Sequence, residues 1–379
     1  MLPGLRKALL APLVAAVAAL IVSSIALLIS GNSPQEAFVE MWKTIDSTES
    51  VVLIINRAVP YYIAGVAVAI GFKMNLFNIG ANGQYVLAAL IAAWVGTKTD
   101  LPAPLHVTLI MFVSVVVAGA WAAIAGVLKV TRNVNEVVAT IMLNFIATGI
   151  VSFLLAEHFR ETETGGLVAQ TEVLPESARI PSLNRLVELT GFHFAPGVRL
   201  LGFLPFAIAL GIGYHLLLNR SRFGYELRLS GMNPDAARAA GVNPKAMIFK
   251  TIVLSGAVAG LIGMHYLLAD PQFYKFGDQF PKTVGFTGIS IALLGRNHPA
   301  GIIAASLVWA TIERGTQRLS TLGIPQEIGP ILQGSFLLAA VIAFEVVKRR
   351  SDAAAATAAA RAVHAPPAPG PVLGSGATA

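Results

Sequence analysis

Long apolar runs separated by short polar or basic segments dominate the chain. An α-helix needs about 20 predominantly apolar residues to cross the hydrocarbon core of a bilayer. The runs lie at residues 8–30, 51–71, 77–96, 102–128, 134–156, 200–218, 247–269, 284–296, 299–317 and 327–347. This pattern predicts an all-α polytopic membrane protein with about ten transmembrane helices, of which 284–296 is too short to cross straight.

The first run has two candidate identities. It follows Arg6 and Lys7, as the apolar part of a signal peptide would. Its apolar stretch exceeds the about 7 to 15 residues typical of a signal peptide, and no small-x-small cleavage site closes it. We therefore expect residues 8–30 to be retained as the first helix.

Basic residues gather in alternate connections between the runs. They are Arg6, Lys7, Lys73, Lys129, Arg132, Arg220, Arg222, Arg228, Arg238, Lys245, Lys250, Arg296, Lys348, Arg349 and Arg350. Lys and Arg concentrate in loops that stay in the cytoplasm, so the pattern predicts a multi-pass protein of the bacterial cell (inner) membrane with both termini cytoplasmic. Segments 31–50 and 157–199 then face outwards.

The composition agrees with a membrane as solvent. The 379 residues are 55% hydrophobic and 12% charged, with a mean hydropathy of +0.70, which leaves too little polar surface for a water-soluble globule. The net charge of +7 lies in short loops, so it does not indicate nucleic-acid binding. The chain has no Cys and its seven His lack ligand spacing, so no metal or cofactor is expected.

Three soluble pieces are expected around a transmembrane domain of residues 1–350. The segment 351–379 is rich in Ala and Pro and is expected to be a disordered cytoplasmic tail. The outer segment 157–199 is long for a structureless connection, so it should form a small cap or docking surface. The inner segment 219–246 separates two apolar runs and carries many charges.

Polar residues recur every four positions in the run 134–156. They are Glu136, Thr140, Asn144, Thr148 and Ser152, which stack on one helical stripe about 24 Å long at 1.5 Å per residue. Polar side chains in hydrocarbon face either a neighbouring helix or a wet cavity. Interhelical hydrogen bonding and lining of a solute path both remain open.

Amides and glycines interrupt the apolar sequence at 75–84. Asn75, Asn78 and Asn82 follow helical spacing, and Gln84 comes just after. Glycines at 80 and 83 permit a break in the helix or a close approach. A broken helix that exposes amides to a cavity is one interpretation, and such breaks form solute sites in transporters. The other is a turn at the membrane interface.

The inner segment predicts a short capped helix. Asn233 can cap it, Pro234 suits its first position, Asp235 favours its N-terminal dipole and Gly241 can end it. With Glu226 and Arg228 before it, this helix is a candidate lever for a soluble partner. A solvated loop is the alternative.

Two absences narrow the mechanism. The sequence has no G-x-x-x-x-G-K-[ST] motif, so coupling to ATP by that route requires another subunit. Arg57 and Glu313 lie near the outer ends of their runs and Glu345 near an inner end, whereas a proton or sodium relay needs carboxylates near the membrane centre. A secondary transporter is therefore disfavoured, although Glu136 keeps it open.

Three stretches resemble the permease subunits of bacterial ABC importers for branched-chain amino acids, simple sugars and nucleosides. They are 77–84, 233–241 and 285–301. Residues 135–144 and the long outer segment with 174–178 are most similar to the nucleoside permeases. Where the family commonly has Glu between Gly80 and Gly83, this chain has Ala81 and Asn82, so the role of that position is open.

The resemblance implies a type II-like permease that takes up nucleosides by alternating access and is itself no enzyme. It implies a second permease subunit, an ATP-binding cassette ATPase and an extracytoplasmic substrate-binding lipoprotein. The candidate path residues are Asn75, Asn78, Asn82, Gln84, Glu136, Thr140, Asn144 and Thr148, and the candidate coupling residues are Glu226, Arg228, Asn233, Pro234 and Gly241. A permease for ribose or another sugar, a proton-coupled secondary transporter and a scaffolding membrane protein are the alternatives.

Overall fold

The computed structural model describes residues 2–161, 169–191, 193–325 and 327–363, and over these residues the fold is helical. The helices are α1 (Leu2–Ile29), α2 (Pro34–Ile45), α3 (Thr48–Phe72), α4 (Ala81–Thr97), α5 (Ala103–Arg132), α6 (Glu136–Glu157), α7 (Asn184–Glu188), α8 (Leu204–Arg220), α9 (Arg222–Met232), α10 (Pro234–Ala239), α11 (Pro244–Gly260), α12 (Ile262–Ala269), α13 (Val284–Leu294), α14 (Pro299–Thr316) and α15 (Ile328–Val363). Two short 3-10 helices, η1 (Glu176–Ala178) and η2 (Leu319–Leu322), complete the described elements.

The all-α membrane fold is confirmed, whereas the number of spans remains a prediction. Each expected run contains a helix. Among the described residues, four helices are long and apolar enough to cross a bilayer by themselves: α3, α5, α6 and the joined α11 and α12. Counting α1 and α2, which bend by 119° at their junction, as one span gives up to five. The helices in the other expected spans do not meet both criteria of length and apolar composition over the described residues.

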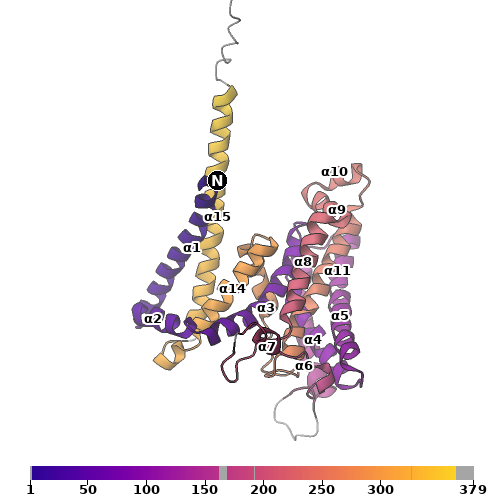
Figure 1. The fold of residues 1–379 in the computed structure, drawn as a ribbon. Coiled ribbons are helices and arrows are strands. Elements are labelled where there is room, and N and C mark those ends of the chain that lie inside the picture. The colour runs from indigo at the N-terminus through magenta and orange to yellow at the C-terminus, as the bar shows by residue number, and fades with distance from the viewer. Residues whose placement is uncertain (1, 162–168, 192, 326, 364–379) are drawn as a thin grey trace, which may run out of the picture.

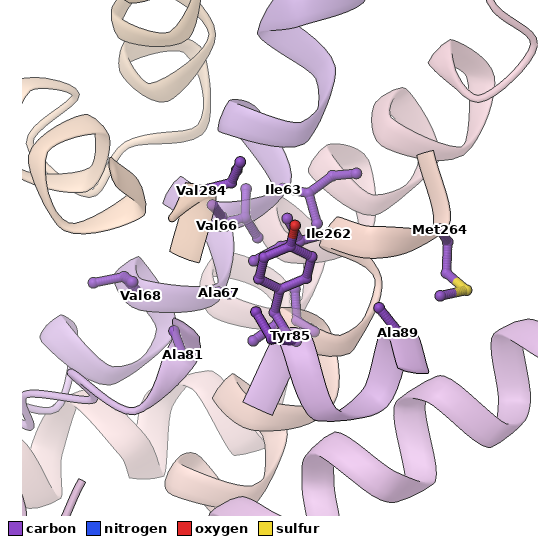
Figure 2. Packing of buried hydrophobic residues seen from close by; sticks show 14 of the residues in the cluster. Ile63, Val66, Ala67, Val68, Ala81, Tyr85, Ala89, Ile262, Met264 and Val284 are labelled. Carbon is purple, nitrogen blue, oxygen red and sulfur yellow. The ribbon is translucent and has the colours of Figure 1, made fainter. Parts of the chain in front are cut away.

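A central bundle buries α3 and α4 on nearly every side. A helix that is apolar all round belongs in a core rather than at a surface, and α3 and α4 show this pattern. Figure 2 shows Tyr85 of α4 surrounded by Ile63 and Val66 of α3, Ile262 of α12 and Val284 of α13. The Tyr85 hydroxyl donates a hydrogen bond to the carbonyl oxygen of Pro281.

The short helix α13 packs against α3 and α4 through two glycines. A Cβ atom on Gly285 would lie 2.5 Å from the Cα of Asn82, and one on Gly288 would lie 2.6 Å from the carbonyl oxygen of Ala64. Three-residue spacing places both glycines on one face of α13. Because no larger residue fits there, these glycines set the depth at which α13 docks.

A second packing unit joins the two ends of the chain. Figure 1 shows α1 and α15 side by side and apart from the bundle around α4 and α5. Their small core consists of Leu27, Ala37, Leu319, Ile324, Ile328 and Leu332. Ser33 caps α2 by accepting a hydrogen bond from the Glu36 N–H, and Pro34 occupies its first turn. Helix α2, inside the expected outer connection 31–50, then packs on α14.

The two ends of the molecule differ in their connections. Figure 1 shows α9 and α10 at the same end as the N-terminus and the last turns of α15, with α7 at the opposite end. This arrangement agrees with the alternation of basic connections in the sequence. We call the end with α9 and α10 the inner end and the other the outer end, and the side of the membrane that each faces remains a prediction.

Helix α15 runs beyond the expected boundary of the tail. The composition predicts disorder from Ser351, whereas α15 continues to Val363. The physical reason is the run of alanines from Ala353, since Ala has the highest helix propensity of all residues. Residues 364–379, the rest of the expected tail, lie outside the described residues.

The substitution Gly288→Ala should lower the stability of the folded protein. The added Cβ meets the backbone of α3, and overpacking costs about 1–3 kcal/mol, more than the about 1 kcal/mol that Ala gains over Gly in helix propensity. The apparent melting temperature of the detergent-solubilised protein measures this. Gly213→Ala in α8 is the control, because nothing lies within 4 Å of its Cβ position. Equal melting temperatures for the two variants would contradict the packing argument.

Candidate functional site

The connection between α3 and α4 carries a closed pair of amides. Asn78 donates from Nδ2 to Oε1 of Gln84 (2.9 Å), and Gln84 donates from Nε2 to Oδ1 of Asn78 (3.1 Å). Asn78 also donates to Oγ of Ser255 in α11 (2.9 Å), which donates to the carbonyl oxygen of Ala67 in α3 (2.7 Å). All three polar side chains are buried. The network therefore ties α3, α4 and α11 together and satisfies its own polar atoms.

The predicted helical spacing through Asn75, Asn78 and Asn82 is not realised. Helix α3 ends at Phe72 and α4 begins at Ala81, later than the expected start of that span at 77. The connection is non-helical because Asn75 adopts a left-handed backbone conformation (φ 56°) and the amide pair replaces helical hydrogen bonds. Four of its eight residues are buried, Asn78 among them, which fits the rule that irregular backbone at membrane depth must be enclosed by protein.

Asn144 joins α6 to α4. Its Oδ1 accepts a hydrogen bond from the N–H of Gly83 (2.8 Å), and its Nδ2 donates to the carbonyl oxygen of Ile79 (2.9 Å). The missing side chain of Gly83 makes room for this contact, since a Cβ there would lie 2.8 Å from Oδ1 of Asn144. Asn144 therefore follows the first of the two interpretations of the polar stripe, in which its side chain bonds to a neighbouring segment.

The rest of the stripe turns away from the bundle towards the outer end. Thr140 is buried and donates to the carbonyl oxygen of Glu136 (2.7 Å), while Glu136 pairs with Lys129 (2.7 Å). Thr148 donates to the carbonyl oxygen of Asn144 (2.9 Å) but is exposed, as is Ser152. A spacing of four residues drifts around a helix with 3.6 residues per turn, so the stripe leaves the packed face.

Asn75 and Asn82, also predicted to lie on the solute path, are in different environments. Asn75 is exposed and donates to the carbonyl oxygen of Gly231 in α9 (2.8 Å). Asn82 is buried in the first turn of α4 next to Gly285, and its Oδ1 has no hydrogen-bond partner within the described part of the chain. The predicted path residues thus divide into an amide network, an exposed helix face and a contact with α9.

The inner segment contains the predicted capped helix, α10. Asn233 accepts hydrogen bonds from the N–H groups of Asp235 and Ala236 (both 3.0 Å), Pro234 begins the helix, and Gly241 follows it with φ 77°. The predicted helix and cap are therefore confirmed. In α9, Glu226 pairs with Arg222 (2.6 Å) and Arg228 donates to the carbonyl oxygen of Leu218. These bonds hold the segment in a defined conformation, and most residues of α10 are exposed.

The inner segment contacts the connection that carries the amide pair. Gly231 lies against Met74, since a Cβ on Gly231 would lie 2.7 Å from the Cα of Met74. The bond from Asn75 to Gly231 adds a second contact at the same place. Burial and the nearby Arg228 lower the pKa of Lys73 in the same connection. The inner segment is therefore in direct contact with the connection that carries the amide pair.

A cavity of about 600 Å³ lies towards the outer end between α3, α12, α14 and the non-helical segment 270–283. This volume falls within the range of about 300–1,000 Å³ typical of small-molecule sites. We call it the outer cavity. Its lining residues are Leu53, Asn56, Arg57, Tyr61, Gly197, Arg199, Leu201, His265, Tyr266, Asp270, Pro271, Gln272, Phe273, Pro281, Thr283, Val284 and Glu313.

An ion pair connects two walls of the outer cavity. Arg57 of α3 donates from Nη1 to Oε1 of Glu313 in α14 at 2.5 Å, and the hydroxyl of Tyr61 donates to the other carboxylate oxygen. The Arg57 and Glu313 side chains are 36% and 33% exposed. Both oxygens of the carboxylate are therefore engaged at the edge of open space.

Aromatic and amide side chains form the remaining walls. The rings of Tyr266 and Phe273 meet edge to face with centroids 5.3 Å apart. Asn56 holds the outer segment in place: it donates to the carbonyl oxygen of Arg199 (2.7 Å) and accepts from the N–H of Leu201 (3.0 Å). Aromatic and polar side chains thus line the same cavity, as they do in many small-molecule sites.

The outer segment 157–199 packs on the segment that lines the cavity. The N–H of Thr171 donates to the carbonyl oxygen of Phe276 (2.8 Å), and the N–H of Leu174 donates to the carbonyl oxygen of Tyr274 (2.7 Å).

At the edge of the outer cavity, burial raises the pKa of Asp270 above its ordinary value, while a hydrogen bond from the Gln272 N–H and the charge of Arg57 lower it.

The sequence analysis did not identify the outer cavity. The pattern marks Arg57 and Glu313 only as charges near the outer ends of two runs, and their positions are 256 residues apart. The available signal was Arg57, alone in the outer half of its apolar run, and Glu313, next to Arg314 in the outer half of another run. Isolated intramembrane charges usually find a partner of opposite sign.

Comparison with known proteins assigns the chain to a family. Residues 50–341 match the family described as branched-chain amino acid transport system, permease component. The chain is 31% identical over 334 residues to the guanosine ABC transporter permease protein NupP of Bacillus subtilis, covering 87% of this chain and 92% of NupP. It is 32% identical over 337 residues to the glucose ABC transporter permease protein TsgB13 of Haloferax volcanii, covering 86% and 85% of the two chains.

Two more similarities complete the comparison. The nucleoside ABC transporter permease protein NupB of Lactococcus lactis is 27% identical over 360 residues, covering 94% of this chain and 97% of NupB. The solved structure of PsaBC from Streptococcus pneumoniae in complex with Fab matches with a TM-score of 0.43 and 11% identity, covering 82% and 95% of the two chains. The match of the family model to most of the chain, together with the relatives NupP and TsgB13, shows that this chain is an ABC transporter permease of the branched-chain amino acid transport system permease family.

Proposed function

We propose that the chain is the transmembrane permease subunit of an ATP-driven importer that takes up nucleosides by alternating access. Its resemblance to permeases named for guanosine and nucleosides, over most of both lengths, supports the substrate class. The observation that carries the proposal is the outer cavity, whose wall combines the rings of Tyr61, Tyr266 and Phe273 with amide and charged groups. A nucleoside offers a flat base for the rings and hydroxyl groups for the polar atoms.

The importer needs further subunits. The chain has no phosphate-binding loop of its own, so an ATP-binding cassette ATPase at the inner end supplies the energy. A second permease completes the membrane path, and a second guanosine permease of Bacillus subtilis, NupQ, is also similar to this chain. A substrate-binding lipoprotein delivers solute at the outer end, where the outer segment offers a docking surface. The complex resides in the bacterial cell membrane, with both termini in the cytoplasm.

We place a second part of the solute path along the exposed face of α6, which packs on α4 and α5 and does not itself line the outer cavity. Thr148 and Ser152 lie on this face beside exposed apolar residues such as Phe145, which is 71% exposed. Polar residues on a helix face that meets lipid are rare and costly, even where a hydroxyl bonds back to its own helix as Thr148 does, which supports a face covered by the second permease. The buried amides Asn78, Asn82, Gln84 and Asn144, with Thr140 and Glu136, lie behind the path and set the position of its walls.

ATP binding and hydrolysis move the inner segment. Glu226, Arg228, Asn233, Pro234 and Gly241 shape α9 and α10, and the contact of Gly231 with Met74 and Asn75 passes the movement to the amide connection. Asn78 and Asn144 hold α4 in place, so a shift there changes how α4 and α6 meet. The helices then exchange an outward opening for an inward one.

A sugar importer is the second candidate. The glucose permease TsgB13 is as similar to this chain as the guanosine permease NupP is. Sugars also bind against aromatic rings, but their hydroxyl groups make more use of charged and amide partners. The two candidates differ in the solute taken up and share the mechanism.

Uptake of radiolabelled nucleosides should depend on this chain and on ATP. We expect cells that lack the gene to lose nucleoside uptake, and depletion of ATP to abolish uptake in cells that carry it. Loss of ribose or glucose uptake instead would favour the second candidate. Uptake that persists without ATP and collapses with the proton gradient would contradict an ATP-driven importer.

Asn75→Gly should uncouple ATP hydrolysis from transport. Glycine keeps the left-handed backbone of Asn75 but removes the hydrogen bond to Gly231. We expect several-fold fewer nucleosides transported per ATP hydrolysed by the reconstituted importer. Asn133→Gly is the matched control, because Asn133 has nearly the same backbone conformation (φ 52°) at the end of α5. An unchanged ratio for Asn75→Gly would argue against transmission through this contact.

Gly149→Leu should block uptake without destabilising the chain. Nothing lies within 4 Å of a Cβ at Gly149 on the exposed face of α6, so leucine fits the isolated subunit but obstructs a path or a permease partner. Gly213→Leu in α8 is the control, since that position is equally open. Uptake rate and melting temperature are measured together. Full uptake in Gly149→Leu would mean that the path lies elsewhere.

A further inference from the structure

The charged side chains that line the outer cavity balance one another. Two cations, Arg57 and Arg199, line it together with two anions, Asp270 and Glu313. Among these four, Arg57 and Glu313 form a direct ion pair at 2.5 Å. The cavity therefore presents polar groups to a solute with no net formal charge from its lining side chains.

We propose that Glu313 is a specificity-determining residue that restricts the outer cavity to solutes without net charge. The inference rests on the proposed function, because it assumes that this cavity receives the transported solute. It deepens that function by excluding phosphorylated solutes, which carry the same base and sugar as a nucleoside.

The geometry explains the exclusion. A guanidinium binds phosphate well, through two parallel N–H donors. Here the Glu313 carboxylate occupies Nη1 of Arg57 and also accepts from the Tyr61 hydroxyl. A phosphate group on the remaining N–H donors of Arg57 would lie close to this carboxylate and to Asp270, which lines the same cavity. Repulsion between these like charges opposes the attraction between the phosphate and Arg57.

A neutral solute meets no such barrier. The Arg57 and Glu313 side chains are 36% and 33% exposed. Hydroxyl groups of a solute can therefore form hydrogen bonds with their exposed atoms without separating the pair. Specificity that rejects a competitor through an unfavourable charge is a common form of recognition. The ion pair thus admits and holds hydroxyl-bearing solutes while it excludes anions.

Loss of the Glu313 charge should open the cavity to anions. In Glu313→Gln the lining has two cations and one anion, and both Arg57 and the Tyr61 hydroxyl lose their charged acceptor. We expect this variant to bind guanosine 5′-monophosphate about tenfold more tightly than the unmodified importer does, and the gain to weaken as salt is raised. Equilibrium dialysis of the radiolabelled nucleotide against the detergent-solubilised complete importer measures the dissociation constant.

Two further variants separate charge from structure, because the ion pair also joins α3 to α14. Arg57→Gln with Glu313→Gln breaks the same tie but restores the charge balance, so it should not gain nucleotide binding. Tyr61→Phe removes one hydrogen bond to Glu313 and keeps every charge, so it should also exclude the nucleotide. Equal gains in the single and double variants, or no gain in Glu313→Gln, would overturn the proposal.

Guanosine uptake by the unmodified importer, measured in the same preparation, separates this inference from the proposed function. If the unmodified importer takes up guanosine and Glu313→Gln binds no more nucleotide than it does, the role of Glu313 is wrong while nucleoside uptake stands. If the unmodified importer takes up no nucleoside, the proposed function fails first.

Discussion

The need to satisfy polar groups inside an apolar protein governs this structure. Water cannot rescue an unpaired amide at membrane depth, so a buried amide is costly unless it finds a partner within the protein. Oδ1 of Asn82 is the exception among the amides described above. Asn78, Gln84 and Ser255 satisfy each other across three helices, and Asn144 does the same for the backbone of α4. The irregular connection between α3 and α4 is stable because these bonds replace the helical ones that it lacks.

Local features were accessible from the sequence because local residues determine them. Apolar length located the helices, and Asn233, Pro234 and Gly241 specified α10 through capping and a left-handed turn. The pattern was less informative at Asn75, whose spacing suited a helix while its bond to Gly231 holds it in a turn. The composition after Ser351 predicts a flexible tail, although the helix propensity of its alanines extends α15.

The outer cavity could not be predicted in the same way. Its ion pair joins α3 to α14, and its aromatic wall combines Tyr61 of α3 and Tyr266 of α12 with Phe273 from a non-helical segment between helices. No period of 3.6 or 2 residues marks such a segment. In the sequence, Tyr61, Tyr266 and Phe273 look like ordinary apolar positions. Only the folded chain places them beside charged and amide side chains in the wall of one cavity.

One turn of α4 connects the amide network to the wall of the outer cavity. Gln84 bonds to Asn78 near the inner end, while the next residue, Tyr85, donates to Pro281 in the segment that lines the outer cavity. Adjacent side chains on a helix point in different directions and are only 1.5 Å apart along its axis. The segment that lines the outer cavity and the amide pair are therefore both bonded to the same turn of α4. A tilt of α4 that weakens the bond between Gln84 and Asn78 must also disturb the bond between Tyr85 and Pro281.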